Sequence, residues 1–123
     1  MNSIEITKKI YSLLSNDETL SGLVGSNIFP LIAESNTEFP FIVFKRNSIT
    51  PEYTKDWITS ETIQVEVVCA SDKYFETIDC AVAVRNKLEG YRDADIREVT
   101  VNYITEDFLN DCYTQRITFN III

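Results

Sequence analysis

Apolar side chains recur at helical spacing in the first 25 residues. They fall at positions i, i+4, i+7 and i+8, and they are Ile6, Ile10, Leu13 and Leu14. This stripe is typical of a helix that buries one face. Asn2 and Glu5 stand just before it in the N-x-x-E arrangement of a capping box. A second short helix is expected to follow and to end at Gly25, because glycine adopts the left-handed C-terminal conformation that most residues resist.

Four later segments have the patterns of strands. Residues 39–44 are apolar on both faces, as in a strand buried between layers or against a neighbour. Residues 62–67 alternate apolar and polar positions, and two further strands are expected around residues 96–105 and 113–123. In the last segment one face is expected to carry Tyr113, Gln115, Ile117, Phe119, Ile121 and Ile123.

Between these strands, residues 71–90 have the pattern of the longest helix. Ser71-Asp72 is expected to cap it and Gly90 to end it. The side chains expected to face inward are Tyr74, Ile78, Ala81, Val82 and Leu88. The order of elements is then α-α-β-β-β-α-β-β. It predicts one α+β domain spanning residues 1–123, with a mainly antiparallel sheet of about four to five strands and two to three helices packed on one face.

Residues 45–60 are polar, contain Pro51 and carry two large aromatic side chains, Tyr53 and Trp57. Connections of this length without clear periodicity are often functional or disordered, and large aromatics are common anchors of interfaces. One interpretation is that Asn47 to Ser60 form an arm that is mobile in the free subunit and becomes ordered on assembly. The other is a long twisted hairpin with both rings folded onto the sheet.

The connection between the last two strands also carries unusual side chains. Phe108 and Leu109 lie between Asp107 and the turn formers Asn110-Asp111. Hairpin tips are normally polar, because their side chains face water. In a loop of four or five residues, one apolar side chain can fold back onto the sheet. Two are harder to bury, so Phe108 and Leu109 are also candidates for contact with another protein chain.

Composition narrows the range of functions that the chain can have. The chain has 11 basic and 19 acidic residues, a net charge of -8, which disfavours specific binding to nucleic acid. There is no secretory leader pattern and no apolar run of the roughly 20 residues that a membrane helix needs. Cys69, Cys80 and Cys112 are odd in number and widely spaced, which favours free thiols in a reducing compartment.

The chemistry that most enzymes require is missing from the sequence. There is no histidine, so Ser-His and Cys-His nucleophile pairs and most zinc sites are excluded. The three glycines do not form a phosphate-binding loop. The carboxylates Asp93 and Asp95, and those near residue 107, do not have calcium-loop spacing and are interpreted as solvated. We therefore expect no catalytic residue, no metal, no cofactor and no enzymatic activity.

Several segments together resemble the tail-completion proteins of long-tailed bacteriophages, which are tail terminator or tail-to-head joining proteins. The segments are Leu20-Ser-Gly-Leu-Val-Gly25, Ile28-Phe-Pro30, Pro40-Phe-Ile-Val-Phe44, Ile63-Gln-Val-Glu-Val67, Arg85 with Leu88-Glu-Gly90, and Tyr113-Thr-Gln-Arg-Ile-Thr-Phe-Asn-Ile121. They span nearly the whole chain in the family's order. The resemblance implies a ring, commonly of six copies, at the head-proximal end of the tail tube. There such a ring ends tail growth and joins the head.

The resemblance also implies partners and a location. The partners are further copies of the chain, the tail-tube protein and a head-completion or connector protein. The location is the virion, and the host cytoplasm during assembly. An acidic lumen would let DNA pass without sticking. A second hypothesis is a small-molecule- or peptide-binding module of a bacterial regulatory protein, since an open sheet leaves one face free for a ligand. The mass in solution separates the two, because such a module would be a monomer or dimer.

Overall fold

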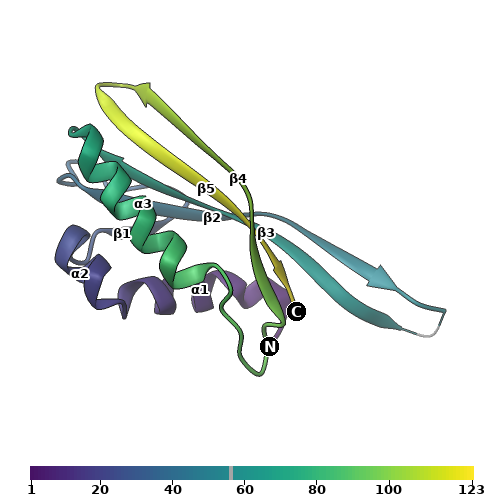
Figure 1. The fold of residues 1–123 in the computed structure, drawn as a ribbon. Coiled ribbons are helices and arrows are strands. Elements are labelled where there is room, and N and C mark those ends of the chain that lie inside the picture. The colour runs from purple at the N-terminus through teal and green to yellow at the C-terminus, as the bar shows by residue number, and fades with distance from the viewer. Residues whose placement is uncertain (56) are drawn as a thin grey trace.

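The computed structural model describes residues 1–55 and 57–123 and shows an α+β fold (Figure 1). Its elements, in chain order, are η1 (Ser3–Glu5), α1 (Ile6–Ser15), α2 (Glu18–Val24), β1 (Ile28–Pro30), β2 (Phe41–Tyr53), β3 (Ile58–Ser71), α3 (Tyr74–Leu88), β4 (Glu98–Leu109) and β5 (Cys112–Ile122). The predicted order of helices and strands is confirmed. The capping box is also present, and it begins the short 3-10 turn η1 directly before α1.

The five strands form one sheet in the order β1-β2-β3-β5-β4. Among the described residues, the β1–β2 pair is parallel, and the β2–β3, β3–β5 and β4–β5 pairs are antiparallel. The three α-helices cover one face of this sheet, and the other face is open (Figure 1). This arrangement confirms the predicted fold class. It also leaves β1 and β4 as the two edges of the sheet.

The core lies between the helices and the middle strands. Its completely buried side chains include Ile6 and Leu14 of α1, Val65 of β3 and Phe119 of β5. Burying a side chain of this size stabilises the fold by about 1.5–3 kcal/mol relative to leaving it in water. The predicted inward face of the last strand is confirmed for Gln115, Ile117, Phe119 and Ile121, which are all buried.

The inward face of α3 differs from the prediction. Thr77, Cys80 and Val84 are buried, whereas Val82 is 52% exposed and Tyr74 lies at the surface. The helix is apolar on two sides, so its pattern does not reveal which side meets the sheet. Ser71 does not cap the helix at its N-cap position, which is occupied by Lys73. The Ser71 hydroxyl instead accepts a hydrogen bond from the Lys73 backbone N–H at 3.1 Å and donates one to Glu76 Oε1 at 2.6 Å.

Residues 45–60 form the distal half of the β2–β3 hairpin, with strand pairing that extends to Tyr53 opposite Ile58. We call residues 47–60 the arm; Asp56 lies outside the described residues. The arm extends beyond the helices at one end of the sheet, whereas the tip of the β4–β5 hairpin lies at the other end (Figure 1). The hairpin interpretation is therefore correct for the backbone.

Candidate assembly surfaces

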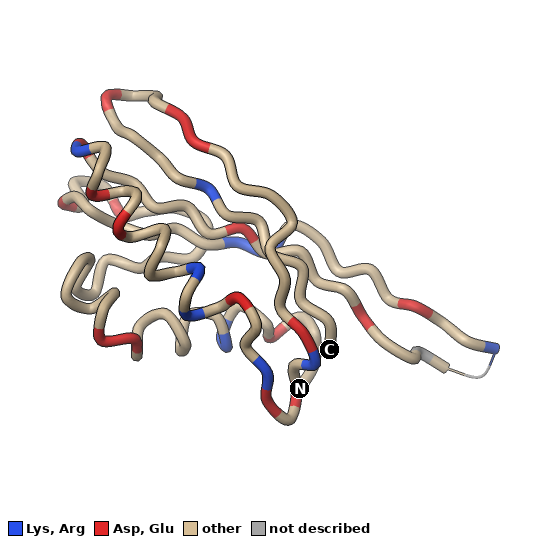
Figure 2. The backbone as a smooth tube through the Cα atoms, viewed as in Figure 1, with Lys and Arg blue, Asp and Glu red and all other residues tan. Residues whose placement is uncertain are grey.

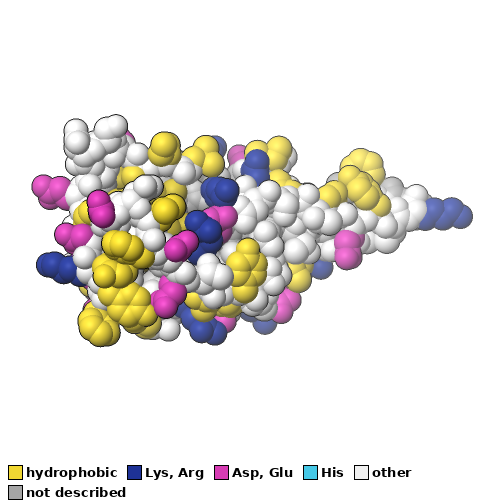
Figure 3. All heavy atoms as spheres, turned by 90° about the horizontal axis from the view of Figure 1, so that it is seen from above, with side chains coloured by type: hydrophobic (Ala, Val, Ile, Leu, Met, Phe, Trp, Pro, Cys, Tyr) yellow, Lys and Arg dark blue, Asp and Glu magenta, His cyan; other side chains and the backbone are white. Residues whose placement is uncertain are grey.

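The tip of the arm presents two large aromatic side chains to solvent. Tyr53 is 69% exposed and Trp57 is 77% exposed, so neither ring is folded onto the sheet as the hairpin interpretation expected. The turn is held by Thr54, whose backbone N–H and hydroxyl donate to the Trp57 carbonyl at 2.8 and 3.0 Å. Figure 3 shows apolar side chains near this tip, and others along the body and at the other end of the molecule. The arm tip is a candidate contact with another protein.

The base of the arm is fixed to the N-terminal segment. The Ser3 hydroxyl donates to Glu61 Oε2 at 2.9 Å, and the Arg46 guanidinium donates to the Ile4 carbonyl at 2.8 Å. The backbones of Glu61 and Ile123 also exchange hydrogen bonds at 3.1 and 3.3 Å. Both chain ends therefore hold the base of the β2–β3 hairpin. None of these contacts reaches the tip of the arm.

The β4–β5 hairpin is tighter than the predicted loop. Its turn consists of Asn110 and Asp111 alone, with φ of 54° and 60°, the conformation of a two-residue hairpin turn of type I′. Phe108 and Leu109 are therefore the last residues of β4, where the prediction put them in a loop of four or five residues. Phe108 is 54% exposed and Leu109 is 65% exposed, so neither is folded fully back onto the sheet.

An aromatic row links this hairpin to the start of α3. The ring of Phe108 lies 4.6 Å from Tyr113, which lies 5.6 Å from Tyr74, which lies 5.5 Å from Phe75, measured between ring centroids. The Phe75 ring at the end of the row is 76% exposed. The sequence prediction missed this row, because Phe75 and Phe108 are 33 positions apart and only the folded sheet brings β5 and α3 together.

Glu106 ties the same two elements together through its carboxylate. It accepts hydrogen bonds from the Gln115 side-chain amide at 2.9 Å and from the Tyr74 hydroxyl at 2.8 Å. These two donors, Gln115 first, lower the pKa of Glu106 and keep it ionised. The hairpin therefore displays a carboxylate beside its apolar side chains, and Figure 2 shows only acidic charge along its distal part.

The open face of the sheet carries an ion network across three strands. Glu66 of β3 lies 3.7 Å from the Lys45 ammonium on β2 and 3.0 Å from the Arg116 guanidinium on β5. Opposite charges on neighbouring strands stabilise their pairing modestly. This face therefore carries charged side chains, with apolar side chains scattered along the molecule between its two ends (Figure 3).

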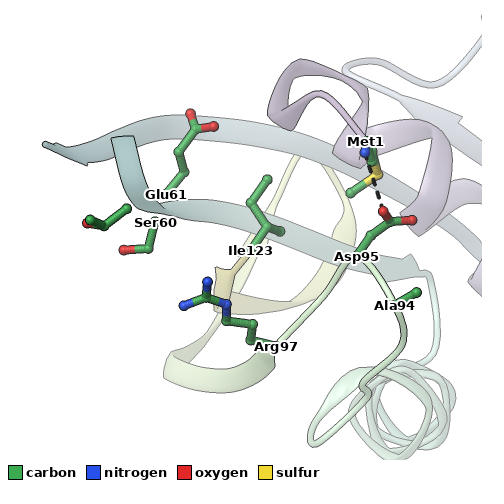
Figure 4. A pocket seen from close by; sticks show the side chains of 8 residues that line it. Met1, Ser60, Glu61, Ala94, Asp95, Arg97 and Ile123 are labelled. Atoms are coloured by element: carbon green, nitrogen blue, oxygen red, sulfur yellow. Dashed lines mark hydrogen bonds and ion pairs between the residues drawn. The ribbon is translucent and has the colours of Figure 1, made fainter. Parts of the chain in front are cut away.

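Where the chain ends meet the arm there is a polar hollow of about 340 Å³ (Figure 4). Its charged side chains are Glu61, Asp95 and Arg97, and the N-terminal ammonium pairs with Asp95 at 3.3 Å. Glu61 is already bonded to Ser3. These contacts join the two chain ends to β3 and to the α3–β4 connection, and both carboxylates take part in them.

Asp93, considered above as a solvated carboxylate, has a structural role. It lies 2.6 Å from the Lys9 ammonium and accepts hydrogen bonds from the Tyr91 hydroxyl and from the backbone of Asp95 and Ile96. These contacts, with Lys9 the strongest, hold its pKa well below the usual range. Asp93 therefore fastens the α3–β4 connection to α1.

Within residues 1–55 and 57–123, no three His, Cys, Asp or Glu side chains are placed to hold a metal ion together.

No helix in the described part of the chain has the length and apolar character needed to cross a membrane.

The comparison with protein families decides the identity of the chain. Residues 8–123 match the family model described as tail completion protein gp17. The chain belongs to this family. It is a structural protein of a phage tail, which favours the structural hypothesis over the ligand-binding module. No curated protein matches the chain.

A solved structure shares the fold of this tail completion protein. The matching chain comes from the structure titled "Virion of native gene transfer agent (GTA) particle", with a TM-score of 0.79 and 14% sequence identity. The match covers 92% of this chain and 90% of the other. At this identity the match supports the fold, and the role in the tail rests on the family.

Proposed function

We propose that the protein assembles as a closed ring on the end of the tail tube, where it stops tail polymerisation and joins the tail to the head. Family membership supports the role in completing tails. The observation that carries the ring is a pair of unlike exposed apolar surfaces on opposite edges of one sheet: Phe108 and Leu109 at the end of β4, and Leu31 and Ile32 directly after β1. Two unlike patches are what a head-to-tail interface requires, and such an interface makes a ring when its rotation closes.

In this proposal the partners are further copies of the chain, the tail-tube protein and a head-completion or connector protein. The protein would act in the virion after assembly in the host cytoplasm, without catalysis. The arm tip, with Tyr53 and Trp57, is the surface proposed to contact the tail-tube or head protein. The net charge of -8 would suit a lumen through which DNA passes without sticking.

Measuring the mass of the purified protein across a concentration series by light scattering, followed by negative-stain imaging, tests the proposal. The expected result is a discrete multiple of the 14.1 kDa subunit and visible rings, alone or on isolated tail tubes. A protein that stays monomeric at every concentration and does not bind tail-tube protein would contradict it.

A further inference from the structure

An apolar groove lies at the edge of the sheet opposite to β4. A hollow of about 500 Å³ lies beside α1 and β1. Its apolar walls are Tyr11, Ile28, Phe29, Pro30 and Phe44, and Thr7 and Ser26 also line it. A second hollow, of about 190 Å³, shares Pro30 and Phe44 with the first and extends along β2. We call the two together the β1 groove. Ile28 and Phe44 form its buried floor, whereas Tyr11 is 46% exposed at its side. Apolar surface left open in this way is a common feature of protein interfaces.

The groove is open because β1 ends early. This strand has only three residues and pairs with Ile42–Phe44 of β2. After Pro30 the chain turns away, with Leu31 at a φ of 67° and 72% exposed. The outer edge of β2 beyond Phe44 therefore has no strand beside it, and the end of a hairpin can approach the groove from this side.

The rim of the groove is basic, although the protein as a whole is acidic. Lys8, Lys45 and Arg46 line it, with one lining carboxylate, Glu34. Lys45 also pairs with Glu66 on the open face and Arg46 donates to the Ile4 carbonyl, so Lys8 is the most accessible of the three cations. The Lys8 side chain is 83% exposed, and its ammonium is 3.9 Å from the Glu5 carboxylate, at the limit of an ion pair. A groove with this rim favours an apolar occupant that carries negative charge.

The β4–β5 hairpin has this combination on the opposite edge of the same sheet. Its tip exposes Phe108 and Leu109 beside the carboxylates of Glu106, Asp107 and Asp111. From residue 98 to residue 115 the sequence contains no Lys or Arg. The turn of only two residues also makes the tip narrow.

We propose that the tip of the β4–β5 hairpin of one copy inserts into the β1 groove of the next. The inference rests on the ring of the proposed function and names its subunit interface. A second copy is the occupant because the two surfaces match in apolar character and are opposite in charge. Because they lie on opposite edges of one sheet, each copy receives a hairpin at one edge and donates one at the other. This is the heterologous contact from which rings are built.

Crosslinking tests the contact directly, because the hairpin has a native thiol. Cys112 directly follows the turn and is partly exposed, whereas Cys69 and Cys80 are buried. Lys8→Cys places a second thiol on the groove rim. With a bismaleimide, this variant should give dimers and higher linked species that disappear when Cys112→Ser is added. Lys87→Cys, a lysine of α3 that does not line the groove, is the matched control.

Charge reversal provides a second test. Asp107→Lys and Lys8→Glu should each weaken association by roughly tenfold or more, because each places like charges across the contact, and the double variant should recover most of the loss. Glu98→Lys, at the other end of β4, should leave association unchanged. An unchanged melting temperature for each variant confirms that the subunit still folds.

The outcomes separate the interface from the ring. If rings form but Lys8→Cys is linked no more than Lys87→Cys, the hairpin-in-groove contact is wrong and the ring stands. The same conclusion follows if both single charge reversals assemble normally. If the unaltered protein never forms rings and does not bind tail tubes, the proposed function fails together with this contact.

Discussion

The two hairpins of this protein differ in how they are supported. The arm of β2 and β3 extends beyond the helices, and its contacts with the rest of the chain are concentrated at its root, through Ser3 and Arg46. The β4–β5 hairpin is attached to α3 near its tip, through the aromatic row and the Glu106 carboxylate. The arm tip is therefore free to reach a distant partner, whereas the second hairpin is positioned rigidly by its own subunit.

The outer strands of the two hairpins, β2 and β4, also differ in how well their edges are protected from pairing with another chain. The β2 edge carries Lys45 and Pro51, and its pairing with β3 is interrupted twice by register shifts. Lysine, proline and bulges are the usual devices that keep an edge strand from pairing with other chains. The β4 edge has neither lysine nor proline and one register shift, between Val101 and Tyr103. The difference fits the contact proposed above, in which the β4–β5 hairpin carries the contact between copies and the arm works through its tip.

The largest effect on stability is expected from a substitution in the core at the base of both hairpins. Phe119 on β5 is completely buried and lies opposite Val65 of β3 and Val101 of β4. Phe119→Ala should lower the free energy of unfolding by about 3–5 kcal/mol, because it removes buried contacts and leaves a cavity. Chemical denaturation monitored by circular dichroism measures the change. A loss below about 1 kcal/mol would mean that the strands around Phe119 are not packed as described.

A smaller effect on stability, and a large one on assembly, is expected at the second hairpin. The double change Phe108→Ser, Leu109→Ser removes two side chains that are already half exposed or more. It should cost about 1 kcal/mol of unfolding free energy, mainly from the contact of Phe108 with Tyr113, while ring formation fails. Melting temperature and particle mass are the two measurements. A large drop in melting temperature with intact assembly would place both residues in the subunit's own core.

The stabilisation that the Glu106 hydrogen bonds give to the β4–β5 hairpin should also depend on pH. Hydrogen bonds from Gln115 and Tyr74 hold the pKa of Glu106 below its ordinary value of 4.5. The stabilisation is therefore present above pH 4.5 and is lost as the pH falls through the lower, folded-state pKa. Glu106→Gln should reduce the loss of stability in this acid range. Unfolding curves at a series of pH values, with Glu98→Gln as the exposed control on the same strand, test this. Identical acid profiles for the wild type and Glu106→Gln would contradict it.

The smallest effect on stability is expected at the arm tip. Tyr53→Ser with Trp57→Ser should change the unfolding free energy by less than about 0.5 kcal/mol, because both rings are largely in solvent. Binding to tail tubes or to the head protein should be lost, while rings of the subunit persist. Trp57 is the only tryptophan, so its fluorescence reports on the arm directly. Red-shifted, quencher-accessible emission is expected in the free subunit, and blue-shifted, protected emission would show that the ring is buried.

The pattern of side chains by itself determined the elements and their order. The Ile6–Leu14 stripe, the alternation around Ile63–Val67 and the one-sided apolar face of residues 113–121 each depend on local periodicity, and all three are present in the structure. The exposed aromatic and apolar candidates could be picked out in the same way, because Tyr53, Trp57, Phe108 and Leu109 stand among polar residues. Periodicity identifies which side chains share a face, and this is enough for the fold class.

Only the tertiary structure decided what each face meets. In α3 two sides are apolar, and the position of the sheet determined that Cys80 and Val84 are buried while Val82 is exposed. Pairing across the β2–β3 hairpin extended into a segment whose local pattern does not predict a strand, because β3 supplies the backbone partners. The link from Phe108 through Tyr113 to Phe75, and the placement of an acidic hairpin and a basic groove on opposite edges, depend on strand order. Strand order is set by contacts between residues far apart in the chain, which local patterns do not encode.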